Sequence, residues 1–443
     1  MRVLIRIIFR ALQGLGGAGN YAISTIIILE MVPPQQFAKY TGIVATVFVF
    51  SFLFGPLFGG AITQNSTWRW IFLLNIPPGA IAVVSLMFTL PNGFPHHHKQ
   101  REIIESFSQS FSQAFKRIDI LGAFLLLAAT LLLVVGLDEA DEQFSWQSAF
   151  TIAVLTIAGV LWILFAIWER WVTMKAVNME PVFPWRFFQN RVWISMLLHG
   201  VLLGMTMFVT MFILPQRFEI VNELSPFHAA VRFIPFTIFS PVASIISSVI
   251  AKSTRIPLMY LLIVGALFQI LAYSLLGTLP QHHDVSARQY GYEILAGFGC
   301  GINIPLLTLM TPFATEKRDH GKFDGFRLVH ERQTLNHISG AAMGAIAQFR
   351  IMGGAIGLAI ATAIQHSYLR SHLSDCLTSG VIETILQSTS AIATLPTDSQ
   401  TLVRATYAAS YNMQMKFLAG MAGAQVITGI TMWKRDPIIA PSA

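Results

Sequence analysis

Eleven stretches of this sequence are apolar over about 20 residues each, and they limit the possible folds more than any other feature. A helix of that length crosses the hydrocarbon core of a bilayer while its backbone N–H and C=O groups pair within the segment. Hydrophobic residues make up 54% of the chain and charged residues 12%, and the mean hydropathy is +0.60. We therefore expect an all-α polytopic membrane protein with about 11 transmembrane helices, near residues 4–29, 41–63, 70–90, 119–137, 148–168, 193–214, 229–250, 257–279, 290–312, 341–364 and 414–433.

Lys and Arg residues are unevenly divided between the loops on the two sides of this predicted bundle. If the loop after the first stretch is cytoplasmic, the loops on that side hold 18 of these residues and the opposite loops hold 7. Cytoplasmic loops carry the excess, so we expect the C-terminus in the cytoplasm. Basic loops beside anionic lipid then account for the net charge of +7. The charge therefore implies no nucleic-acid partner.

Few residues suggest metals, cofactors or covalent modification. Cys300 and Cys376 are too few for a disulfide framework. The three consecutive histidines at 96–98 do not converge on one metal ion. We expect no metal site and no cofactor, and the absence of a catalytic constellation or a Walker-type phosphate loop argues against an enzyme or an ATP-driven pump. The glycosylation sequon at Asn65 falls on the predicted outer side.

The string RALQGLGGAG at residues 10–19 combines a cation with small residues inside the first stretch. On a helix, Arg10, Gln13, Gly14 and Gly17 share one face, because they are spaced i, i+3, i+4 and i+7. Arginine inside a membrane costs about 2.5 to 3.5 kcal/mol on insertion scales and normally faces a cavity or a partner. A functional role for Arg10 is one interpretation, and snorkelling of its side chain to the interface is the other.

The second stretch contains the run GPLFGG, in which Gly55 and Gly59 have the small-xxx-small spacing of close helix packing. Pro56 removes one backbone hydrogen bond and predicts a local bend. The same glycine spacing recurs later in the chain, where ordinary helix packing also accounts for it, at Gly297 and Gly301 and at Gly353 and Gly357.

These strings resemble those of a known family. RALQGLGGAG resembles the fourth-helix motif of the major facilitator superfamily, and GPLFGG followed by WRWIFLLNIP resembles its fifth-helix antiporter motif. With YGYEILAGFGCG at 290–301 and AQFRIMGGAIGLAI at 347–360, nearly the whole chain is similar to the fungal fourteen-helix drug:proton antiporter subfamily. The resemblance implies proton coupling for Arg10 and Gln13. It implies a packing and antiporter-motif role for Gly14, Gly17, Gly55, Pro56, Gly59 and Gly60, and an outer-loop role for Trp68, Arg69, Trp70 and Asn75.

Aligning the first stretch with the family's fourth helix predicts a major facilitator fold that lacks its first three helices. The resemblance then divides the chain into a remnant of the N-terminal bundle with three helices, a cytoplasmic linker, a linking helix pair, a cytoplasmic loop, a six-helix C-terminal bundle with a cytoplasmic insertion, and a cytoplasmic tail. These parts span, in order, residues 1–90, 91–118, 119–168, 169–192, 193–433 with the insertion at 313–340, and 434–443. Residues 321–340 interrupt the family pattern, and a retained intron or a loop insertion explains them.

The predicted function is proton-coupled efflux of a hydrophobic small molecule such as a drug, a toxin or a fungal secondary metabolite. Its partners are the substrate, protons and the lipid bilayer, and we expect a monomer in the cell membrane. The alternatives are a truncated remnant that does not transport, and a siderophore or nutrient carrier of the same superfamily. His199 could titrate or bind substrate, or be a structural histidine. Arg350 could also titrate or bind substrate, or its side chain could snorkel to the membrane interface.

Overall fold

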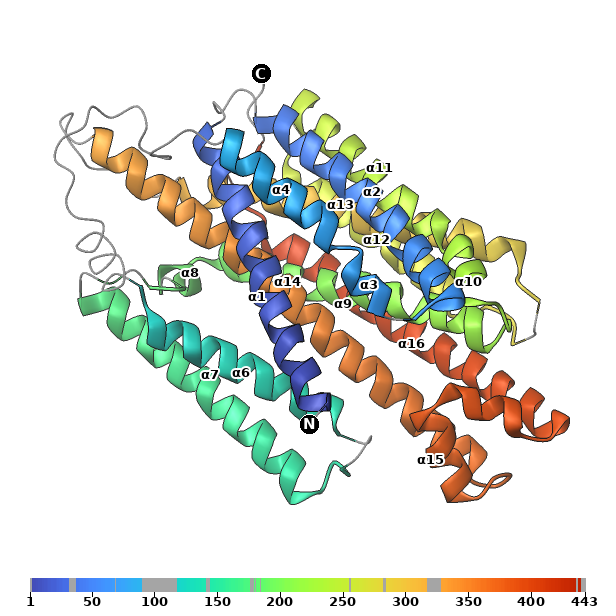
Figure 1. The fold of residues 1–443 in the computed structure, drawn as a ribbon. Coiled ribbons are helices and arrows are strands. Elements are labelled where there is room, and N and C mark those ends of the chain that lie inside the picture. Colours follow the sequence, from blue (N-terminus) through green and yellow to red (C-terminus); the bar gives the residue numbers. More distant parts are fainter. Residues whose placement is uncertain are drawn as a thin grey trace.

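The chain is seen in a computed structural model that describes residues 2–31, 37–67, 69–89, 118–140, 144–175, 179, 181–183, 185–254, 256–281, 284–316, 328–435 and 437–439. The described residues form helices joined by short connections (Figure 1). The helices are α1 (Arg2–Met31), α2 (Phe37–Asn65), α3 (Arg69–Leu73), α4 (Ile76–Thr89), α6 (Ile120–Asp138), α7 (Ala149–Lys175), α8 (Arg186–Gln189), α9 (Arg191–Ile220), α10 (Pro226–Arg232), α11 (Ile234–Ser253), α12 (Leu258–Leu276), α13 (Ala287–Glu316), α14 (Leu328–Leu373), α15 (Ser379–Gln387), the 3₁₀ helix η2 (Thr389–Thr394) and α16 (Thr397–Thr431).

Polar side chains cap the starts of several of these helices. Asp119 accepts a hydrogen bond from the backbone N–H of Gly122 at the start of α6 (2.7 Å), and Asn190 accepts one from Val192 at the start of α9 (3.1 Å). Such caps satisfy N–H groups that have no partner within the helix. A helix inside a membrane needs them because lipid offers no replacement.

The expectation of an all-α membrane protein is confirmed. Within the described residues, eight helical segments are long and apolar enough to cross a membrane, namely Arg69–Thr89, Ile120–Leu137, Ala149–Lys175, Arg191–Ile220, Pro226–Ser253, Leu258–Leu276, Ala287–Thr311 and Ala342–Leu373. The expected stretches at 4–29, 41–63 and 414–433 are also helical, in α1, α2 and α16. Helix α16 carries buried polar residues, among them Ser410, Gln414 and Gln425.

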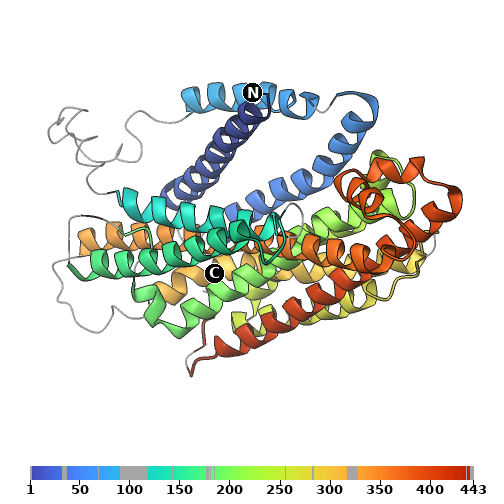
Figure 2. The same ribbon diagram turned by 90° about the horizontal axis from the view of Figure 1, so that it is seen from below.

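The helices form one large bundle and a smaller layer beside it. Helices α9 to α14 and α16 make the bundle, and the α6–α7 hairpin packs on α14. In Figure 2, α1, α2 and α4 lie on one side, where α4 stands away from the bundle and α1 slants from the level of α4 toward it. Helix α2 is the member of this layer that packs extensively on the bundle, against α10 and α11. Residues 91–117 of the expected linker at 91–118, with its three histidines, lie outside the described residues, as do residues 317–327 of the expected insertion at 313–340.

The bundle has two apolar cores. One core includes residues from the later part of α9, the ends of α12 and α14, and the first part of α16. Ile213, Tyr273 and Tyr411 belong to it. The other is formed by the start of α9, the start of α12 and the end of α13, and includes Trp193 and Leu258. Between them, along the same helices, lies a layer of buried polar residues, Thr206, Gln269, Asn303 and Gln425.

Candidate transport interface

Helix α2 makes a close backbone approach to α10 at Gly60. A Cβ atom on Gly60 would lie 2.7 Å from the carbonyl oxygen of Pro226 and 3.0 Å from the Cα atom of Phe227. Real Cβ atoms do not come so near to backbone atoms, so only glycine fits without movement. The run GPLFGG therefore provides a close backbone contact between the layer of α1 to α4 and the large bundle.

The other small residues of this run do not make such a contact in the described structure. A Cβ atom on Gly55 or Gly59 would meet no atom of the described residues within 4 Å. Pro56 lies within a continuous helix from Phe37 to Asn65. The close crossing thus depends on Gly60 rather than on the pair that the small-xxx-small spacing suggested.

Arg10 faces the short helix α3. Its guanidinium carbon lies 4.3 Å from the centre of the Phe72 ring, which is a cation–π distance. Arg10, Gln13, Gly14 and Gly17 are all exposed, and a Cβ atom on either glycine would meet no described atom within 4 Å. The helical spacing does place these four residues along α1, and the contact of Arg10 with an aromatic ring was not evident from the sequence.

The residues expected in the outer loop surround the break between α3 and α4. Asn75 lies in that break and its amide donates to the carbonyl oxygen of Ile71 (3.2 Å). Arg69 and Trp70 are exposed at the start of α3, and Trp68 lies outside the described residues. Asn65 is exposed at the end of α2, where its amide donates to the carbonyl oxygen of Ala61 (3.0 Å).

The polar layer inside the bundle is a hydrogen-bonded network that joins four helices. The amide of Gln425 (α16) donates to Oγ1 of Thr206 in α9 (3.2 Å) and to Oε1 of Gln269 in α12 (3.0 Å). The amide of Asn303 (α13) donates to Oε1 of Gln425 (3.1 Å). Sequence reasoning missed this network, although the amide side chains within apolar stretches were a signal, since a buried polar group in lipid needs a partner.

His199 lies beside this network and is fully buried in α9. Its Nδ1 atom is 3.0 Å from the hydroxyl of Thr428 in α16. The interhelical contact fits a structural histidine, and Nε2 of His199 has no hydrogen-bond partner among the described residues.

Arg350 lies in the middle of α14, which runs from Leu328 to Leu373. Its backbone packs on Gly204 of α9, where a Cβ atom would overlap the Arg350 carbonyl oxygen. Gly353 and Gly357 continue the same crossing against Val201 and Met205 of α9. The glycines of 353–357 therefore do pack closely, and so do Gly297 and Gly301, against Phe236 and Ser240 of α11.

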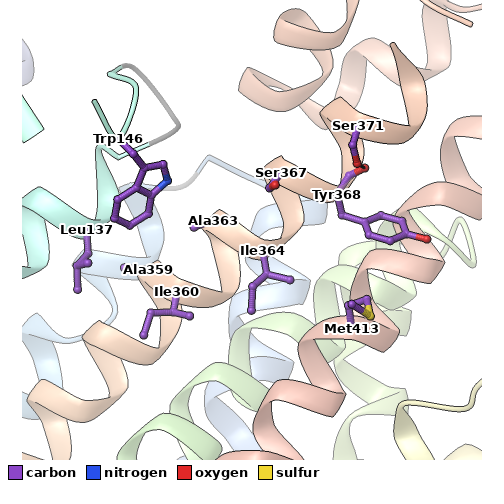
Figure 3. Close-up of a pocket in the computed structure, with 10 residues that line it drawn as sticks. All are labelled: Leu137, Trp146, Ala359, Ile360, Ala363, Ile364, Ser367, Tyr368, Ser371 and Met413. Atoms are coloured by element: carbon purple, nitrogen blue, oxygen red, sulfur yellow. Dashed lines mark hydrogen bonds between the residues drawn. The ribbon is translucent and has the colours of Figure 1, made fainter. Parts of the chain in front are cut away.

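An apolar groove lies between the α6–α7 hairpin, α14 and α16 (Figure 3). Its volume is about 470 Å³ and most of its lining is aliphatic or aromatic. The lining residues are Leu137, Trp146, Ala359, Ile360, Ala363, Ile364, Ser367, Tyr368, Ser371 and Met413. Sequence reasoning singled out none of them, because they come from segments that are distant in the chain.

Comparison with known proteins decides the family. The sequence model of the Major Facilitator Superfamily matches residues 3–140 of this chain. The MFS-type transporter FPY5 of Fusarium mangiferae is 33% identical over 436 residues, which are 98% of this chain and 69% of that relative. The chain belongs to the major facilitator superfamily. The resemblance seen in the sequence is thereby confirmed, and the chain is a multi-pass membrane protein of a transporter family.

Other members of the superfamily that match are named as fungal efflux pumps. The efflux pump aunC of Aspergillus niger is 29% identical over 314 residues, and the efflux pump ustT of Ustilaginoidea virens is 30% identical over 313 residues. These matches cover 70% and 71% of this chain and 56% of each pump. The chain thus spans little more than half the length of these two pumps.

Proposed function

We propose that this member of the major facilitator superfamily exports a hydrophobic or amphipathic small molecule, such as a drug, a toxin or a fungal secondary metabolite, in exchange for protons. The observation that carries the proposal is the backbone approach of Gly60 to Pro226. It lies in the run that resembles the antiporter motif, and it joins α2 to the C-terminal bundle. The names of the fungal efflux pumps among the relatives support the same activity.

Transporters of this kind bind substrate between two helical bundles and move one bundle against the other. Contacts between the bundles must then be tight in one state and able to change in another. The α2–α10 crossing suits this role because Gly60 permits backbone contact over a small area, without interlocked side chains. Arg10 and Gln13 are the proposed proton-coupling residues of this layer, and His199 and Arg350 are candidates in the bundle.

The placement in the membrane follows from the charges of the loops. The excess of Lys and Arg on one side supports a cytoplasmic C-terminus. That orientation puts Asn65 outside, as a candidate for glycosylation. We place the chain in the cell membrane as a monomer, in which each copy contains its own transport path.

Dye retention in yeast tests the proposal. Cells that express the whole chain are loaded with a lipophilic cationic dye such as rhodamine 6G, and the retained fluorescence is compared with that of cells carrying an empty vector. The expected result is lower retention, which a protonophore restores to the level of the empty vector. Equal retention in both cell types, with the chain detected at the cell surface, would contradict export of this class of compound.

A further inference from the structure

Two buried carboxyl groups lie together where the α6–α7 hairpin joins the large bundle. Asp119 precedes α6 and Glu169 lies near the end of α7, with 1% and 0% of their surfaces exposed. Both reach the same glycine. A Cβ atom on Gly122 would overlap Oδ2 of Asp119 and would lie 2.8 Å from Oε1 of Glu169. The two oxygens are therefore within about 5 Å of each other, a distance at which carboxylates perturb one another strongly.

The hydrogen bonds of Asp119 use one of its oxygens only. Oδ1 accepts from the backbone N–H of Gly122 (2.7 Å) and from the indole N–H of Trp168 (2.9 Å). Oδ2 of Asp119 and both carboxyl oxygens of Glu169 are buried without a hydrogen bond of ordinary geometry. Oδ2 of Asp119 and Oε1 of Glu169 both lie on the side of Gly122 to which a Cβ atom would point.

Within the part of the chain that the structure describes, no cation is placed to balance two negative charges. Among the described residues, neither carboxyl group forms an ion pair. The basic groups of α7 are directed elsewhere, since Arg170 lies over the ring of Trp185 and Lys175 over that of Trp171. Two carboxylates this close and this buried cannot both be ionised at a modest energy.

The same pair lies at a junction between parts of the fold. The backbone of Val182 and Phe183 faces the Glu169 carboxyl group. The Phe183 ring packs against Phe187 and against Phe349 of α14. Glu169 therefore contacts both Asp119 of the hairpin and the segment that leads into the large bundle.

We propose that Asp119 and Glu169 form a proton-binding site that holds one proton between them, and that this proton keeps the α6–α7 hairpin docked on the large bundle. The shared proton lets one oxygen donate to the other, so that a single negative charge remains, on the group that Gly122 and Trp168 already stabilise. Loss of the proton leaves two charges in the junction and weakens it. The proposal concerns the hairpin and does not depend on the transport activity.

Thermal unfolding of the purified whole chain between pH 5 and pH 9 tests the site. The parent protein is expected to lose a few degrees of its melting temperature as the pH rises through this range, because the pair then releases its proton. E169Q keeps a neutral partner for Asp119 at every pH, so the fall with pH should be smaller than in the parent protein. E383Q, which changes an exposed glutamate of α15, is the control and should keep the parent's slope. An E169Q variant with the parent's slope would overturn the proposal.

Two further measurements keep the test decisive if E169Q does not fold. Besides the pair, Glu293 is the other fully buried carboxyl group of the described helices, so an E293Q variant is used for infrared spectroscopy. At pH 7 it should keep the C=O stretch of a protonated carboxyl group, and absence of this band overturns the proposal. Stability at pH 9 that rises with added Na⁺ or Ca²⁺ would also overturn it, since a metal ion would then bridge the pair.

Discussion

Gln269 of α12 and Gln425 of α16 form a reciprocal amide pair in the middle of the bundle, although they are 156 residues apart in the chain. Each donates its amide N–H to the other's Oε1 atom, at 3.3 and 3.0 Å. Thr206 and Asn303 extend the pair to α9 and α13. Four helices are thus held in register by side chains that lipid cannot replace as partners.

Removing one amide of this pair should weaken the bundle. We expect Q425L to lower the free energy of unfolding by about 1 to 2 kcal/mol, because Gln269 and Asn303 each lose a buried partner. The measurement is the melting temperature of the protein in detergent. Q281L changes an exposed position of the α12–α13 connection, and its melting temperature should equal that of the parent protein. If Q425L also melts with the parent, the network does not stabilise the bundle.

The crossing of α9 and α14 tolerates no side chain at Gly204. G204A places a methyl group on the Arg350 carbonyl oxygen, and such overpacking costs about 1 to 3 kcal/mol. G344A on α14 is the matched control, because a Cβ atom there meets no described atom within 4 Å. We expect a large loss of monodisperse protein in gel filtration for G204A and none for G344A. Similar yields for both variants would show that this crossing is looser than described.

Two neighbouring glycines of α2 separate the antiporter-motif contact from general effects on the helix. G60A pushes α2 from the backbone of Pro226, whereas G59A meets no described atom within 4 Å. We expect G60A to lose most of the dye export and G59A to keep it, with both variants at the cell surface in equal amounts. Equal export by the two variants would remove the α2–α10 contact from the mechanism.

Arg10 should matter for transport much more than for stability. Arg10 is exposed and packs on the half-buried ring of Phe72, and cation–π pairs at exposed sites contribute about 0.5 to 1 kcal/mol. R10A should therefore melt close to the parent and lose proton-coupled export. F72L removes the ring and keeps the cation, so it should export nearly as well as the parent. Loss of export in F72L to the same degree would mean that the contact, and not the charge, is what transport needs.

The apolar stretches predict the helices well because length and hydropathy are local properties of the sequence. They do not predict the break between α3 and α4 at Asn75, which divides one expected helix into two. The expected stretch at 414–433 covers only the second half of α16, which begins at Thr397 and whose buried face carries Gln414 and Gln425. Its apolar character is lower because those amides pair inside the bundle rather than face lipid.

The candidate site is less predictable because it is made between segments. Glycine spacing in GPLFGG indicated a close crossing, yet only the fold decides that Gly60, and not Gly55, touches α10. The acidic pair is a stronger case. Asp119 precedes α6 and Glu169 lies in the last part of α7, and only the packing of α6 on α7 brings both side chains close to Gly122.

Proton exchange in proteoliposomes is the most direct test of proton-coupled export. Purified chain is reconstituted with a pH-sensitive dye inside the vesicles, and a lipophilic cation, tetraphenylphosphonium, is added across an imposed pH gradient. We predict that the cation speeds the collapse of the gradient in vesicles with the parent protein, and not in vesicles that are empty or hold R10A. A gradient that decays at the same rate in all three would contradict proton-coupled transport by this chain.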